Sequence, residues 1–181
     1  RVLASRLAQV SILSGTALGM SFLHDQKPTP VLHHDLKSDN VLLWEQGQEF
    51  VAKIGDFGLA TGTQASTMRT GKGKSGAGAG TLAYKAPEAF DDEFTTASEV
   101  YSFGVVAWEV LTGAVPWDGY SEARLTKAII KEERPPLAAD VAATPLGQLV
   151  QRCWAQEPGQ RPNFTVVARE LQDRLVEAKT A

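Results

Sequence analysis

The sequence predicts a mainly α-helical domain with one small β-hairpin. Four segments carry apolar residues at the three- and four-residue spacing of a helix, namely residues 3–24, 121–130, 146–154 and 166–178. A fifth segment, residues 98–111, is apolar nearly all round, which is typical of a helix buried on every side. Only two short runs, residues 41–44 and 50–54, favour strands. We therefore expect a helical bundle that carries a single hairpin.

Size and composition indicate one domain. The chain has 181 residues, 43% of them hydrophobic and 22% charged, which is enough for one full core. The net charge of -3 gives no argument for a nucleic-acid or membrane-surface partner, and we expect neither. No run of 18 apolar residues occurs, so we expect no membrane segment in this chain. The single cysteine, Cys153, excludes an internal disulfide and favours a reducing compartment, so we expect a cytoplasmic protein with Cys153 as a buried apolar residue.

The first half of the chain divides into a helix, a hairpin and a loop. The helix of residues 3–24 should end near Asp25, because two prolines follow within five residues. The two strand-forming runs flank residues 45–49, which gives a hairpin signal. Residues 61–80 contain six glycines, three basic residues and no acid, and predict a mobile loop. The G-x-G-x-x-G pattern at residues 71–76 lacks a preceding strand and a following helix, so we reject it as a nucleotide-binding loop.

The second half predicts the helical bundle. Gly113 and Pro116 should end the buried helix of residues 98–111. Proline-containing stretches at residues 134–136 and 157–162 separate the helices that follow. No segment repeats at a fixed period, which excludes a solenoid.

Polar residues that suit phosphate chemistry gather in the octapeptide HHDLKSDN at residues 33–40. Asp35, Lys37 and Asn40 could converge on a phosphate and its metal, since a carboxylate accepts a proton, a lysine neutralises charge and an amide oxygen ligates a hard cation. Alone, such a peptide is equally typical of a polar turn. Two later motifs favour the chemical interpretation: Asp-Phe-Gly at residues 56–58 and Ala-Pro-Glu at residues 86–88.

These three motifs, in this order and spacing, resemble the protein kinase family. The resemblance covers nearly the whole chain and implies a protein-kinase-like C-terminal lobe over residues 1–181, with an activation segment at residues 56–88. No glycine-rich strand-turn-strand, strand lysine or partner glutamate precedes residue 33, so we expect the N-terminal lobe to be absent from this chain. The chain also starts without methionine, and we expect it to be a piece of a longer protein.

The resemblance assigns roles to the polar residues. Asp35 would accept or orient the proton of the substrate hydroxyl, and Lys37 would contact the γ-phosphate of ATP. Asn40 and Asp56 would hold Mg²⁺, while Thr81 would hydrogen-bond Asp35 and Lys37. These assignments imply ATP and Mg²⁺ as cofactors and a protein as substrate.

Two apolar residues take roles from the same resemblance. Leu42 would form the floor under the adenine of ATP, although a plain core leucine is an equal interpretation of the sequence. Phe57 would pack beneath the site, where its position would set active or inactive geometry.

Lys37 and the Gly-Thr-Leu-Ala-Tyr run at residues 80–84 resemble the pattern of serine/threonine kinases. Four further stretches resemble the tyrosine-kinase-like group, which includes mixed-lineage and receptor-interacting kinases: residues 37–40, 100–104, 108–109 and 152–154. The favoured acceptor is therefore a serine or threonine hydroxyl.

Glu88 and Arg161 resemble the charged pair that ties the end of the activation segment to the helical bundle, and we expect them to be in contact. Two residues depart from the family pattern. His34 stands where many kinases have the arginine that reads a phosphate on the activation segment. Glu99 stands where the family has an aspartate that accepts hydrogen bonds from the catalytic loop. Because Thr96-Ala97-Ser98-Glu99 also fits a capping box, Glu99 has two equal interpretations.

The sequence thus predicts a protein serine/threonine kinase that needs the missing lobe, so that these residues alone would be inactive. The alternatives are a pseudokinase or protein-interaction module, and a purely structural helical domain. Against both, Asp35, Lys37, Asn40 and Asp56 are all present, and neither alternative requires the full set.

Overall fold

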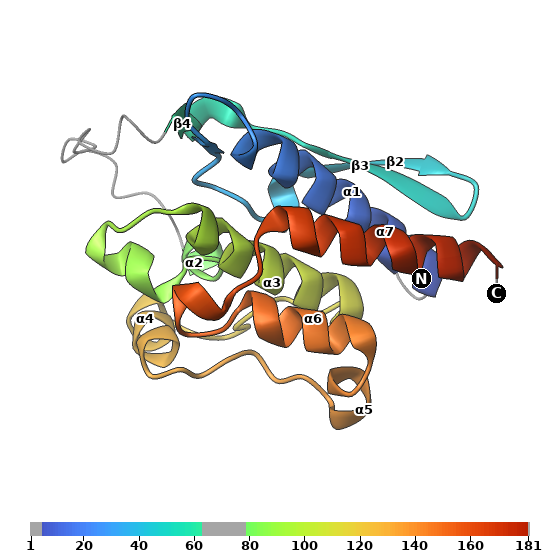
Figure 1. Ribbon diagram of the computed structural model, residues 1–181. Helices are drawn as coiled ribbons and strands as arrows, with labels where there is room; N and C mark the ends of the chain where they lie inside the picture. Colours follow the sequence, from blue (N-terminus) through green and yellow to red (C-terminus); the bar gives the residue numbers. More distant parts are fainter. Residues whose placement is uncertain (1–4, 63–78, 181) are drawn as a thin grey trace.

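The buried helix predicted at residues 98–111 lies at the centre of the fold (Figure 1). The computed structural model describes residues 5–62 and 79–180. Within these ranges the chain forms, in order, α1 (Arg6–His24), β1 (Val31–Leu32), β2 (Val41–Gln46), β3 (Glu49–Ile54), β4 (Thr61–Gly62), α2 (Ala79–Leu82), α3 (Thr96–Thr112), α4 (Glu122–Ile130), α5 (Ala139–Ala142), α6 (Pro145–Cys153) and α7 (Phe164–Thr180). The prediction of a mainly helical fold with a small hairpin is confirmed.

Helix α3 is buried on nearly every side, as its sequence predicts. Phe103 is fully buried, and its ring meets that of Phe164 on α7 edge to face, with the ring centroids 5.5 Å apart. The helix begins at a capping box formed by Thr95 and Ser98, each of whose side chains bonds the other's backbone N–H. It ends at Gly113, whose φ of +66° is a conformation that glycine adopts without strain. This helix therefore forms the central support for its neighbours.

The other long helices pack against one another and against α3. Helices α1 and α7 lie side by side (Figure 1). Helix α6 packs on α3 at Gly104, where a Cβ atom would come within 3.0 Å of the Trp154 backbone nitrogen. A larger residue at this position would therefore push the two helices apart. The predicted role of Cys153 as a buried apolar residue is confirmed, since it lies fully buried beside Gly104, and burial raises the pKa of its thiol to about 12.

The predicted hairpin is formed by β2 and β3, which pair antiparallel from Val41 opposite Ile54 to Gln46 opposite Glu49. Gly47 makes the turn with a φ of +64°. The inner face of β3 packs on α1, where Ala52 approaches Gly15 closely. Several apolar residues on the hairpin nevertheless stay exposed, as described below.

Several short elements carry no signal in the sequence. Strands β1 and β4 form a second antiparallel pair, in which Val31 lies opposite Gly62 and Leu32 opposite Thr61. Helix α5 is a single turn that packs on α6. Of the loop predicted at residues 61–80, the structure describes only the two ends. Residues 61–62 form β4, and residues 79–80 belong to α2. Residues 63–78, including the rejected glycine pattern at 71–76, lie outside the described residues.

Helix α1 is long and apolar enough, by length and composition alone, to cross a membrane. In this fold more than half of it is buried against protein, chiefly α7 and β3, as is usual for a core helix. The expected absence of a membrane segment stays a prediction.

Candidate active site

The loop at residues 33–40 follows β1 and is anchored by His33. His33 is fully buried; its Nε2 lies 2.8 Å from the carbonyl oxygen of Gly55, and its ring meets that of Phe57 edge to face at 5.3 Å. His34 has a φ of +67°, which is uncommon for a residue with a side chain. His33 thus ties the loop to the Asp-Phe-Gly motif directly before Asp56.

Glu99 of α3 holds the backbone of this loop. Its Oε1 accepts the His34 N–H at 2.5 Å, and its Oε2 pairs with Nε2 of His24 on α1 at 2.7 Å. The capping-box interpretation of residues 96–99 is wrong, because the helix begins one residue earlier and Thr95 and Ser98 form the box. The glutamate therefore does what the resemblance assigns to aspartate at this position.

Three predicted site residues meet in one network. The Asp35 carboxylate lies 2.7 Å from Nζ of Lys37 and accepts the Nδ2 hydrogen of Asn40 at 3.1 Å. Asn40 also donates to the Asp35 carbonyl oxygen at 2.7 Å. Because the Asn40 amide group donates twice to Asp35, its oxygen is directed elsewhere and can serve as a metal ligand. Lys37 and Asn40 both contact Oδ2 of Asp35, and together they hold the carboxylate in one orientation.

Thr81, 44 residues farther along the chain, joins the same network. Its Oγ1 accepts a hydrogen bond from Lys37 Nζ at 3.3 Å. This confirms the predicted contact with Lys37, while no hydrogen bond from Thr81 to Asp35 is found among the described residues. Lys37 thereby joins the loop at residues 33–40 to Thr81 of α2.

Asp56 lies next to this network without a direct side-chain contact to it in the part of the chain that the structure describes. The neighbouring Gly55 N–H donates to the Asn40 carbonyl oxygen at 2.8 Å, which places Asp56 close to Asn40. Asp56 has a φ of +56° and accepts the Gly58 N–H at 3.4 Å. No cluster of three His, Cys, Asp or Glu side chains for a metal occurs within residues 5–62 and 79–180. A carboxylate and an amide oxygen still fit Mg²⁺, which takes few protein ligands and relies on phosphate and water for the rest.

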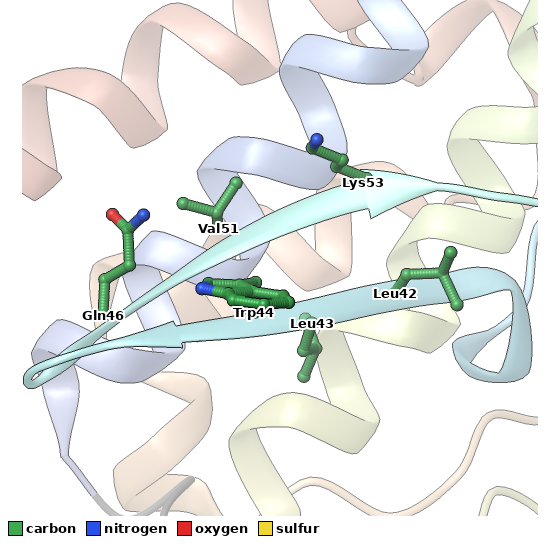
Figure 2. Close-up of a pocket in the computed structure, with 6 residues that line it drawn as sticks. All are labelled: Leu42, Leu43, Trp44, Gln46, Val51 and Lys53. Carbon is green, nitrogen blue, oxygen red and sulfur yellow. The ribbon is translucent and has the colours of Figure 1, made fainter.

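Leu42 is not a core leucine. Its side chain is 61% exposed, and it lines a hollow on the hairpin together with Leu43, Trp44, Gln46, Val51 and Lys53 (Figure 2). Asp35, Asn40 and Asp56 do not line this hollow. They lie past the end of β2 at which Val41 pairs with Ile54. The core interpretation of Leu42 is therefore wrong, and its role under an adenine remains a prediction.

Phe57 does not pack as tightly as the resemblance suggests. Half of its side chain is exposed, although one edge of the ring contacts His33. It borders a groove between α1 and β3 that also includes Leu18 and Phe22. The position beneath the site is thus open on one side in the described structure.

The predicted pair of Glu88 and Arg161 is in contact. Two parallel hydrogen bonds, of 2.6 and 2.9 Å, join the guanidinium to the carboxylate, and the Arg161 side chain is fully buried. Burial alone would raise the pKa of Glu88, but the hydrogen bonds from Arg161, its own backbone and Ser98 lower it overall. The Ala-Pro-Glu motif at residues 86–88 is therefore fastened to the bundle by a charged pair.

A family model described as protein tyrosine and serine/threonine kinase matches residues 4–171. The chain belongs to this kinase family. The prediction from the motifs at residues 33–40, 56–58 and 86–88 is thereby confirmed.

Curated relatives of this kinase chain come from several organisms. It is 41% identical to human receptor-interacting serine/threonine-protein kinase 3 over 164 residues, which cover 84% of this chain and 30% of the relative. It is 35% identical to rat mitogen-activated protein kinase kinase kinase 11 over 182 aligned positions, covering 95% of this chain and 21% of the relative. A seven transmembrane domain-containing tyrosine-protein kinase 1 from Dictyostelium discoideum is 36% identical over 155 residues, covering 83% and 21%.

The names of these relatives indicate a kinase subgroup, and the alignments show how much of each relative the chain spans. The receptor-interacting kinase among them agrees with the prediction of the tyrosine-kinase-like group, which is confirmed. The chain spans only 21% to 30% of the length of these three relatives. Relatives are named for both serine/threonine and tyrosine specificity, so their names do not identify the acceptor residue.

The site of this kinase chain contains a second hydrogen-bonded cluster that sequence reasoning missed. The Tyr84 hydroxyl donates to Glu109 Oε2 on α3 at 2.7 Å and lies 3.0 Å from the Ser38 hydroxyl. Burial raises the pKa of both Tyr84 and Glu109. Ser38 adjoins Lys37, so the cluster supports the catalytic loop from α3. No local pattern could have shown it, because Ser38 and Glu109 are 71 residues apart.

Proposed function

We propose that this chain is the C-terminal lobe of a protein serine/threonine kinase, which transfers the γ-phosphate of Mg-ATP to hydroxyl groups of protein substrates. The observation that carries the proposal is the network of Asp35, Lys37, Asn40 and Thr81, in which Lys37 joins the Asp35 carboxylate to Thr81 of a distant segment. Membership of the kinase family supports it.

In the proposed mechanism Asp35 orients the substrate hydroxyl and receives its proton. The hydrogen bond from Asn40 and the ion pair with Lys37 fix the Asp35 carboxylate before substrate binds, which lowers the entropic cost of alignment. Lys37, held between Asp35 and Thr81, is close enough to contact both the acceptor and the transferred phosphate.

Asn40 and Asp56 would hold Mg²⁺ through oxygen atoms. A metal ion held there would supply positive charge that neutralises the phosphates. The orientation of the Asn40 amide towards Asp35 supports this role, since it leaves the amide oxygen available.

Lys37 and its contact with Thr81 support serine or threonine as the acceptor. In the resemblance these two residues together mark serine/threonine kinases, and the structure joins them at 3.3 Å. Of the three relatives described above, one is named as a serine/threonine-protein kinase and one as a mitogen-activated protein kinase kinase kinase.

Nucleotide binding would use the exposed side of the hairpin. Leu42 would contact the adenine from below, and an N-terminal lobe would cover it from above. Without such a cover, the isolated 181 residues would bind ATP poorly and transfer no phosphate. A pseudokinase or protein-interaction module is the second candidate, because the exposed apolar hairpin would also suit a binding partner.

Phosphate transfer by the complete kinase that contains this chain tests the proposal. We expect Asp35→Ala to abolish radiolabel transfer from ATP to a generic protein substrate while the circular dichroism spectrum stays unchanged. Asp140→Ala, at an exposed position on α5, is the matched control and should transfer normally. Near-normal turnover by folded Asp35→Ala would contradict the assignment, and a wild-type protein without transfer would favour the interaction module.

A further inference from the structure

Lys85 lies between two aromatic rings beside the candidate active site. Its Nζ is 4.8 Å from the centre of the Phe90 ring and 5.6 Å from that of Phe94, within the range of cation–π contacts. The side chain is partly buried. Among residues 5–62 and 79–180 no carboxylate forms an ion pair with it. The rings restrict the motion of this cation, but they do not neutralise its charge.

Two separate connections place Lys85 near the catalytic residues. Its backbone N–H donates to the carbonyl oxygen of Leu82, so one tight turn joins it to Thr81, which contacts Lys37. On the other side, the Phe94 ring meets the ring of His34 edge to face at 5.3 Å, and His34 directly precedes Asp35. Lys85 follows Thr81 by four residues, which span at most about 14 Å even when extended. An extended peptide whose hydroxyl reaches Asp35 could therefore reach Lys85 with a residue a few positions away.

The acids nearest to Lys85 in the sequence do not neutralise it. Glu88, three residues away, is bound to Arg161 by two hydrogen bonds. Residues 91–93 are acidic and lie between Phe90 and Phe94 in sequence, but all three are exposed and none forms an ion pair with Lys85. A carboxylate that approaches Lys85 from a substrate would meet a partly desolvated cation that has no ion-pair partner in the described part of the chain.

We propose that Lys85 determines substrate specificity by binding an acidic side chain within about four residues of the phosphorylated serine or threonine. This inference rests on the proposed kinase function and adds the chemistry of the preferred substrate. Phe90 and Phe94 act as positioning residues, because they hold the Lys85 ammonium group at the edge of the site.

The test is phosphorylation of a peptide series by the complete kinase. Each peptide carries one serine and, at one of the four positions on either side, glutamate, glutamine or lysine. We expect one position, or two adjacent ones, at which glutamate raises kcat/KM about three- to tenfold over glutamine, mainly through KM.

Variants of Lys85 assign the preference to this residue. Lys85→Met keeps a long apolar stem against the rings and should remove the preference for glutamate while the glutamine peptide reacts as before. Lys85→Arg should retain the preference, and Lys85→Glu should transfer it to the lysine peptide. Lys127→Met, at an exposed position on α4, is the control and should change nothing.

Each of the other possible results would contradict the proposed role of Lys85. Wild-type transfer without any preference for glutamate, or a preference that persists in Lys85→Met, would overturn the inference while leaving the proposed function intact. If Lys85 instead binds a phosphate on the kinase itself, phosphatase treatment would alter transfer to every peptide equally, and the inference would again fail. Absence of transfer to all peptides would refute the proposed function, and this inference with it.

Discussion

Large apolar side chains are buried in the helical half of the molecule and exposed on its hairpin. Phe103 on α3 and Leu171 on α7 are fully buried, whereas Leu42 is 61% and Trp44 72% exposed on β2. The helices cover one another, since α3 is surrounded by its neighbours (Figure 1). Nothing in the described residues covers the outer side of the hairpin. Apolar side chains gathered on one surface mark a place where a ligand or another protein segment binds.

The hydrogen bonding of polar side chains also differs between the two regions. Arg161 and Glu88 are saturated with hydrogen bonds inside the bundle, which is typical of a structural pair. Asp56 beside the hairpin accepts only a 3.4 Å bond from Gly58 within the described chain. We infer that the helical half serves stability and that the hairpin edge serves chemistry, and the following changes test that division.

The largest expected effect is the loss of phosphate transfer in Asp56→Ala. In the complete kinase, transfer should fall to about one thousandth or less, because the carboxylate acts on metal and phosphate charge. Thermal stability should stay unchanged, since the side chain supports no packing. Asp173→Ala, at an exposed position on α7, serves as the control in the same radiolabel assay. A folded Asp56→Ala enzyme with near-normal turnover would place the chemistry elsewhere.

Truncation of an aromatic residue should separate the two regions by stability. Phe103→Ala should lower the free energy of unfolding by about 3–5 kcal/mol, because it leaves a cavity in a closed core. Trp44→Ala should change it by less than about 0.5 kcal/mol, because most of the ring already contacts solvent. Urea denaturation of the purified chain measures both values. Equal losses would show that the hairpin is covered within this chain and would remove the contrast.

The Glu88–Arg161 pair should make stability depend on pH. The pKa of Glu88 in the folded protein lies below its ordinary value of 4.5, so the pair stabilises the fold above about pH 4.5 and this contribution is lost as the pH falls through the lowered value. Glu88→Gln should therefore be clearly less stable than wild type at pH 7, and the difference should shrink towards pH 3.5. Glu133→Gln, at an exposed position, controls for general acid effects. A difference that stays constant over this range would mean that the carboxylate charge is not what stabilises the pair.

The smallest effect concerns phosphorylation of the activation segment. Burial lowers the pKa of His34, with the neighbouring Glu99 opposing it, so the ring is largely neutral at pH 7 and binds a phosphate weakly. Alanine at all four candidate sites, Ser66, Thr67, Thr70 and Ser75, should therefore change the rate of the complete kinase less than about tenfold. These four residues lie outside the described residues and are chosen on composition alone.

One result would contradict this role of His34, and one further variant tests it. A hundredfold loss of rate in the fourfold alanine variant would show that a phosphate on this segment controls activity, although His34 replaces the arginine that binds it in many kinases. His34→Arg should increase the difference in rate between phosphorylated and phosphatase-treated enzyme, since a guanidinium group stays charged at any physiological pH.

Periodicity and spacing in the sequence predict much of this molecule. The long helices follow from apolar spacing, and the burial of α3 follows from its lack of a polar face. The contact between Glu88 and Arg161 could be expected because motifs flank both residues. In each case several residues carry the same signal.

Other features could not be predicted, because their causes are not local. Strands β1 and β4 have two residues each, too few for a pattern, and they pair only because the fold brings them together. Glu99 had two equal interpretations until Thr95 proved to cap α3 one residue earlier. The exposure of Leu42 depends on what lies above the hairpin, and its own sequence resembles that of a core strand.

Titration of the purified 181-residue chain with ATP and Mg²⁺ tests the central claim most directly. Calorimetry measures binding, and a radiolabel assay on the same sample measures transfer. We propose that the Asn40 and Asp56 side chains provide one half of a site that must close on the nucleotide from both sides, so we expect binding no tighter than about millimolar and no autophosphorylation. Micromolar binding, or transfer that Asp35→Ala abolishes, would show that the chain builds a complete site by itself and would contradict the account.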